Sequence, residues 1–74
     1  MARSRSNVTN RVREFRFHSG EMTQQDLATR IGVARQTIIA IEQGRFCPSL
    51  ESALRMARVF DAPVDEIFSL TDAS

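Results

Sequence analysis

The apolar residues of this chain recur at helical spacing, in short runs that end at a glycine or at a proline. Gly20, Gly32 and Gly44 close the first three runs, and Pro63 interrupts the last. Glycine ends helices because it adopts the left-handed conformation without steric cost, and proline breaks them because it lacks a backbone N–H. The pattern predicts an all-α fold of five short helices with no convincing strand.

The first three helices have recognisable starts. Apolar residues at i, i+4 and i+7 predict a first helix over about residues 9–18, capped by Thr9 or Asn7. The second helix is expected to begin at Thr23, which has an acid three positions later and so resembles a capping box. The third helix is expected to begin near Arg35. The residues of these two helices that are expected to face the core are Leu27, Ala28, Ile31, Ile38 and Ile41.

The fourth helix is expected to begin at Ser49, its N-cap, and to end before Pro63. Its apolar residues cover most of its circumference, which is typical of the central helix of a small domain. They are Leu50, Ala53, Leu54, Met56, Ala57, Val59 and Phe60. A short fifth helix is expected to carry Val64, Ile67 and Phe68.

The chain has 74 residues, which is enough for one small domain and excludes a multi-domain or large-cleft enzyme. We expect the domain to span 7–70, with flexible ends at 1–6 and 71–74. Cys47 is the only cysteine and His18 the only histidine, so no internal disulfide and no zinc cluster is expected. A domain of this size without such a constraint is marginally stable, which favours self-association.

No segment predicts a membrane helix. The longest apolar run, Ile38 to Ile41, is far shorter than the ~20 residues that a membrane helix needs. Arg3 and Arg5 near the start are not followed by the apolar stretch of a signal peptide. We therefore expect a cytoplasmic protein, without contact with a membrane and without a cofactor.

Charge is unevenly distributed. Residues 1–20 contain five arginines and one acid, residues 59–74 contain four acids and no base, and residues 21–58 are nearly balanced. This asymmetry suits a protein that presents one face to a polyanion, although a patchy surface without function is the alternative. All ten basic residues are arginine, whose side chain suits phosphate and guanine, but genome composition could produce the same bias.

The segment from Thr23 to Gly44 has the layout of a helix-turn-helix, in which the second helix enters the DNA major groove. Two helices of about eight residues flank a three-residue turn at 32–34, and the small Ala28 allows them to approach closely. Any all-helical protein contains similar geometry, so spacing alone leaves a purely structural interpretation open. The outward face of the second of these helices favours DNA because it lacks acids. It comprises Arg35, Gln36, Thr37, Ile39, Ala40 and Gln43, with Arg45 just beyond.

Several segments together resemble the Xre/Cro family of helix-turn-helix transcriptional regulators. They are Gln24-Gln25-Asp26-Leu27-Ala28, Ile31-Gly32-Val33, Arg35-Gln36-Thr37-Ile38, Ile41-Glu42-Gln43-Gly44-Arg45 and Pro48-Ser49-Leu50. The resemblance runs from about Asn10 to Phe68 and implies a compact five-helix phage-repressor-like bundle. It also implies a homodimer that binds operator DNA.

The resemblance assigns roles by position. Gln24 resembles a glutamine that anchors a DNA phosphate at a helix N-terminus, and Gln43 and Arg45 resemble further phosphate contacts. Arg35 and Gln36 stand at the base-reading end of the recognition helix, where arginine can bind guanine and glutamine adenine. The full set of implied base-reading residues is Arg35, Gln36, Thr37, Ile39 and Ala40.

Arg16 and Glu42 match a pair that in this family joins the first helix to the recognition helix and orients it. The alternative is two exposed, unpaired charges. The sequence departs from the family pattern in three places. Ala34 and Pro63 stand where capping residues are usual, and the turn at 20–21 has one extra residue.

The predicted dimer interface lies in the C-terminal part, because that part holds more apolar groups than one short helix can bury. Its expected members are Met56, Phe60, Val64, Ile67, Phe68 and Leu70.

The sequence favours a sequence-specific DNA-binding regulator, with a repressor expected. The alternative is a protein-interaction module of the same fold, such as an antitoxin, with an unidentified protein partner. An enzyme is not expected, because no paired carboxylates, His/Cys dyad or phosphate-binding glycine loop is present.

Overall fold

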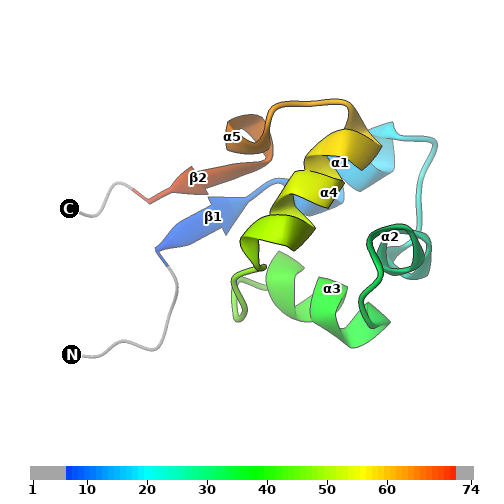
Figure 1. Ribbon diagram of the computed structural model, residues 1–74, viewed down its shortest axis with the longest axis horizontal. Helices are drawn as coiled ribbons and strands as arrows, with labels where there is room; N and C mark the ends of the chain where they lie inside the picture. The colour runs from blue at the N-terminus through cyan, green and yellow to red at the C-terminus, as the bar shows by residue number, and fades with distance from the viewer. Residues whose placement is uncertain (1–6, 72–74) are drawn as a thin grey trace.

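The structure, a computed structural model, describes residues 7–71 and contains five helices and a two-stranded sheet within them (Figure 1). The helices are α1 (Val12–His18), α2 (Gln24–Ile31), α3 (Arg35–Glu42), α4 (Leu50–Phe60) and α5 (Val64–Ile67). The strands are β1 (Val8–Asn10) and β2 (Phe68–Leu70). The predicted flexible ends, 1–6 and 71–74, lie outside the described residues except for Thr71, whose N–H donates to the carbonyl of Asn7 at 2.6 Å.

Two of the expected helix caps are confirmed. The hydroxyl of Thr23 accepts from the N–H of Asp26 at 3.0 Å, and the carboxylate of Asp26 accepts from the N–H of Thr23 at 3.3 Å, which completes a capping box. The hydroxyl of Ser49 accepts from the N–H of Ser52 at 3.1 Å and begins α4. Gly32 ends α2 with φ 79°, a left-handed conformation that glycine adopts without strain, so α3 can follow after a turn of three residues.

The prediction of a chain without strands is wrong at both ends. β1 and β2 pair antiparallel, with Val8 opposite Leu70 and Asn10 opposite Phe68. Each strand has only three residues, too few for an alternating pattern to be visible in the sequence. The first helix consequently begins at Val12 instead of at about residue 9. The N-cap residue is Arg11, which makes no side-chain cap hydrogen bond, so the expected cap by Thr9 or Asn7 is wrong. The side-chain oxygen of Asn10, one residue earlier, accepts from the N–H of Val12 at 3.1 Å.

One core joins the helices. All five residues expected to face inward from α2 and α3 are buried, which confirms that part of the prediction. Within residues 7–71 the buried apolar residues are Val12, Met22, Leu27, Ala28, Ile31, Ile38, Ile41, Ala53, Met56, Phe60 and Ile67. No polar or charged residue is buried among the described residues. None of the helices in this part of the chain is long and apolar enough to cross a membrane.

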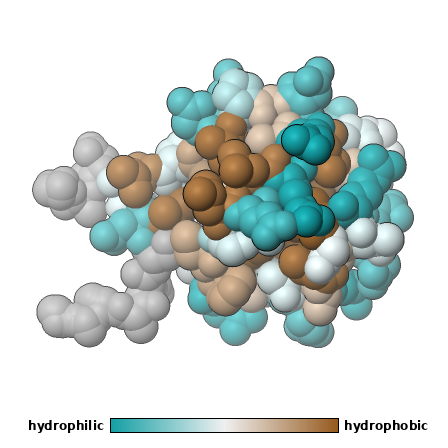
Figure 2. Space-filling view, in the orientation of Figure 1, coloured by the Kyte–Doolittle hydropathy of each residue, from teal (hydrophilic) through white to brown (hydrophobic). Residues whose placement is uncertain are grey.

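The prediction that α4 is a central helix, covered on most of its circumference, is wrong, because one face of α4 is exposed. Leu50 is 73% exposed and Leu54 is 52% exposed, whereas Ala53 and Met56 face the core. The helix lies on the outside of the bundle, where no further element covers it. Figure 2 shows the result, an apolar area over α4 that extends towards α5 and β2.

Candidate nucleic-acid interface

The first turn of α3 is the most accessible part of the predicted recognition helix. Arg35 and Gln36 are exposed, and neither side chain has a hydrogen bond or ion pair with another described residue. Thr37, Ile39 and Ala40 are half-buried, so only part of each is available to a ligand. Ala34 is the N-cap residue and is extended. It makes no side-chain hydrogen bond to the helix, because alanine has no hydroxyl.

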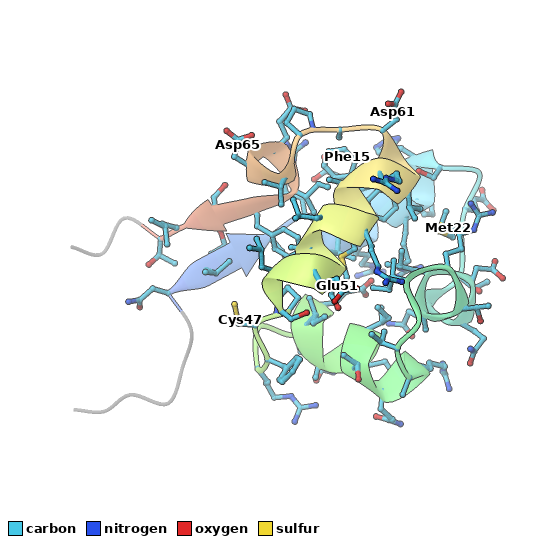
Figure 3. The ribbon with its side chains drawn as sticks, viewed as in Figure 1. Phe15, Met22, Cys47, Glu51, Asp61 and Asp65 are labelled. Atoms are coloured by element: carbon cyan, nitrogen blue, oxygen red, sulfur yellow. The ribbon has the colours of Figure 1, made fainter. Side chains whose placement is uncertain are left out.

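Glu42 lies in the last turn of α3, and Glu42 and Glu21 line the groove beside this helix. The first turn of α3 contains no acid. Figure 3 labels Asp61 and Asp65, which lie beyond the C-terminal end of α4 and on α5, at the opposite side of the molecule from α3. A helix end without acids is what a DNA-binding face requires where it meets the bases.

The last turn of α3 is held by a half-buried polar network around Glu42. The guanidinium of Arg16 donates from Nε at 2.7 Å and from Nη2 at 3.1 Å to the two carboxylate oxygens of Glu42. The two side chains are only 14% and 9% exposed, so they are not the exposed, unpaired charges of the alternative interpretation. A third nitrogen of Arg16, Nη1, donates to the carbonyl of Met22 at 2.7 Å.

Gln24 belongs to the same network, which the sequence did not indicate. Its side-chain nitrogen donates to Glu42 at 3.1 Å, so the start of α2 is bonded to the end of α3. The residue is half-buried and lines an open groove together with Gln43 and Ile39. The structure therefore brings two of the three predicted phosphate contacts to one groove beside α3.

The third predicted phosphate contact, Arg45, lies past the end of α3. Its Nε donates to the side-chain oxygen of Gln43 at 2.9 Å, and both residues are exposed. The intervening Gly44 has φ 77°, which turns the chain away from the helix axis. Cys47 lies in the loop that follows, exposed and unpaired.

One further ion pair lies on the exposed side of α1. The hydrogen bonds from Arg11, together with its positive charge, lower the pKa of Glu14 below its usual value. Both side chains are about half exposed, so solvent screens the pair and it contributes little to stability. Among residues 7–71 no group of three or more His, Cys, Asp or Glu side chains could hold a metal ion.

Half of the predicted dimer interface is not available to a partner. Met56 and Ile67 are fully buried and Phe60 is 9% exposed, because all three pack in the core of their own chain. Val64 and Phe68 are half-buried, and Leu70 is 79% exposed. The prediction overlooked that the short helix α5 can bury the side chain of Ile67 in the core of its own chain.

Comparison with known proteins places the chain in a family. Residues 12–67 match the helix-turn-helix family HTH_3. An uncharacterised HTH-type transcriptional regulator of Archaeoglobus fulgidus is 47% identical over 62 residues, which are 84% of this chain and 87% of the relative. The cryptic phage CTXphi transcriptional repressor RstR of Vibrio cholerae is 30% identical over 61 residues, which are 82% of this chain and 54% of RstR.

Solved structures of similar fold include regulatory and DNA-binding proteins. The restriction-modification controller protein C.AhdI from Aeromonas hydrophila superposes with a TM-score of 0.67 at 31% identity, over 74% of this chain and 82% of that one. The N-terminal DNA-binding domain of SinR from Bacillus subtilis has a TM-score of 0.65 at 26% identity, over 72% and 77% of the two chains.

The chain therefore belongs to the helix-turn-helix regulators of the Xre/Cro type, which confirms the family resemblance. It is a transcriptional regulator with a DNA-binding helix-turn-helix formed by α2 and α3, and it is not an enzyme.

Proposed function

We propose that this regulator is a repressor that binds an inverted-repeat operator as a homodimer, with α3 of each copy in the major groove. The exposed, acid-free first turn of α3 carries the proposal, because its arginine and glutamine have no partner among residues 7–71 and are free to meet base edges. In this proposal, residues 7–70 form one DNA-binding domain. Similarity to RstR, a phage transcriptional repressor, supports repression instead of activation.

The two sets of contacts follow from the position of each side chain. The proposed base-reading residues are Arg35, Gln36, Thr37, Ile39 and Ala40, and the proposed phosphate contacts are Gln24, Gln43 and Arg45. The first set lies on α3 itself, and the second lies at the start of α2 and after the end of α3. This division is the usual one for helix-turn-helix proteins, in which backbone contacts position the helix and base contacts give specificity.

We propose a homodimer that uses the exposed apolar surface of α4 and β2, formed by Leu50, Leu54 and Leu70. α4 packs on α5, and α5 continues into β2; Figure 2 shows an apolar area over this part of the molecule. Val64 and Phe68, both half-buried, remain at its edge. An exposed apolar area of this kind marks an interface, and a homodimer uses the same surface on both copies.

Replacing Leu54 with glutamate is expected to weaken the dimer at least about tenfold, because a carboxylate would be desolvated against apolar partner atoms. The melting temperature of the monomer should hardly change, because Leu54 is 52% exposed in the single chain. Sedimentation equilibrium over a range of protein concentrations measures the effect. Phe17→Glu is the matched control, since Phe17 is 64% exposed on α1 and lies outside this surface. Wild-type protein that remains monomeric at high micromolar concentration would contradict the proposed dimer.

Selection of bound sequences from random DNA tests the proposed function most directly. We expect enrichment of an inverted repeat whose half-sites lie about 34 Å, or one helical turn, apart. Enrichment of no sequence would favour the protein-interaction module instead.

Affinity for random DNA should fall steeply between low and physiological salt, because arginines that bind phosphates release counterions from the DNA. The selected site, placed in a promoter, should lower expression of a reporter gene, and increased expression would contradict a repressor.

A further inference from the structure

The two ends of the recognition helix are held very differently. Its last turn is bonded to side chains from three other elements, namely Asn10 of β1, Arg16 of α1 and Gln24 of α2. Its first turn, which would contact bases, has no side-chain cap. The first half of α3 is held by the burial of Ile38 in the core, whereas the polar contacts that tie the helix to other elements are concentrated at its last turn.

Of these three side chains, Asn10 bonds to the backbone of α3, whereas the other two bond to the side chain of Glu42. Its side-chain Nδ2 donates to the carbonyl of Ile41 at 2.9 Å, while its Oδ1 accepts from the N–H of Val12 at 3.1 Å. The partners define the orientation of the amide, because the nitrogen must face a carbonyl and the oxygen an N–H. Both bonds are partly buried, so water competes with them only weakly.

The type of contact matters for the orientation of the helix. Glu42 contacts Arg16 and Gln24 through its own side chain, whose torsions can adjust while the helix moves. The bond from Asn10 holds the helix backbone itself at the carbonyl of Ile41, and the amide of Asn10 has less freedom because its oxygen is also bonded to the N–H of Val12. Asn10 ends β1, which is paired with β2, so the carbonyl is tied to a sheet that joins residues 8–10 to residues 68–70.

We propose that Asn10 is a positioning residue for DNA recognition, which fixes the end of α3 to the β1–β2 sheet and thereby sets how the first turn of α3 meets the bases. α3 has eight residues. Such a helix is ~12 Å long, so a tilt of about 5° at one end moves the other end by about 1 Å. That displacement is enough to spoil hydrogen bonds to base edges, which require short and well-aligned contacts. The inference rests on the proposed binding of a specific operator.

The substitution Asn10→Ser separates the two bonds of Asn10. A serine hydroxyl can still accept from the N–H of Val12, as in a serine turn, but it is too short to reach the carbonyl of Ile41. Because the change is neutral, it does not alter long-range attraction to DNA. Thr9→Ala is the matched control, since the exposed hydroxyl of Thr9 donates to the carbonyl of Ser69 in the same sheet and has no other hydrogen bond within the described part of the chain.

Two measurements are made on each variant of the full chain. The first is the ratio of affinities for the selected operator and for random DNA at one salt concentration. We expect Asn10→Ser to lower this ratio about five- to tenfold, while its affinity for random DNA stays within about twofold of wild type. The second is amide hydrogen exchange without DNA. The N–H groups of Gly44 and Arg45, which close the end of α3, should exchange about fivefold faster than in Thr9→Ala.

Asn10→Asp is the second variant, because it retains the acceptor for Val12 and replaces the donor with an oxygen that faces the carbonyl of Ile41. It should lower the ratio at least as much as Asn10→Ser. An equal loss of affinity for operator and random DNA in both variants would overturn the positioning role, as would unchanged discrimination or unchanged exchange. Wild-type protein that selects no sequence would instead refute the proposed operator binding, so the two failures are distinguishable.

Discussion

Replacing Arg16 with alanine is expected to destabilise the protein by about 3 kcal/mol and to weaken operator binding at the same time. The carboxylate of Glu42, 9% exposed, would lose two of its three hydrogen-bond donors and keep only Gln24. Breaking one partner of a buried ion pair is costly because the remaining charge stays desolvated. For a domain of this size the loss corresponds to a fall in melting temperature of at least about 12 °C, which circular dichroism would measure.

Arg55→Ala provides the comparison. Arg55 pairs with Glu51 on the exposed face of α4, where the two side chains are 53% and 74% exposed. Solvent screens that pair, so its loss should cost no more than about 0.5 kcal/mol. Equal and small effects of the two substitutions would show that the pair of Arg16 and Glu42 is superficial and does not orient α3.

Replacing Arg35 or Gln36 with alanine is expected to cost about 1–3 kcal/mol of binding free energy against the operator, and much less against random DNA. Both side chains are exposed on the first turn of α3 and have no partner within the described residues. Discrimination should be lost at one or two base pairs in each half-site, because each side chain meets one or two base edges. A binding assay with single-base variants of the operator measures this loss.

Arg45→Ala should lower affinity without changing sequence discrimination. Arg45 lies after Gly44, beyond the end of α3, where we expect it to meet the sugar-phosphate backbone and not the bases. Its loss should weaken binding to all DNA alike and reduce the slope of log affinity against log salt by about one unit per half-site. If Arg45→Ala changed the sequence preference while Arg35→Ala lowered all affinities equally, α3 would dock in another orientation.

Local signals in the sequence determined the helices from α2 onward. The caps at Thr23 and Ser49 and the turn at Gly32 involve residues within a few positions of one another, so their chemistry is visible in the sequence itself. The same is true of the inward face of α2 and α3, because helical periodicity brings their apolar residues to one side. Together these features were sufficient for the helix-turn-helix and for the family.

Only the tertiary structure decided which surfaces are covered and which distant residues meet. The pairing of β1 with β2 joins residues about sixty positions apart, and three-residue strands leave no periodic signal. Burial of Met56 and exposure of Leu54 depend on which element covers each side of α4, and two apolar residues of one helix look alike in sequence. For the same reason Asn10, expected inside a helix, was not predicted to contact α3. Its bond to Ile41 exists because the fold brings the end of a strand to the end of the recognition helix.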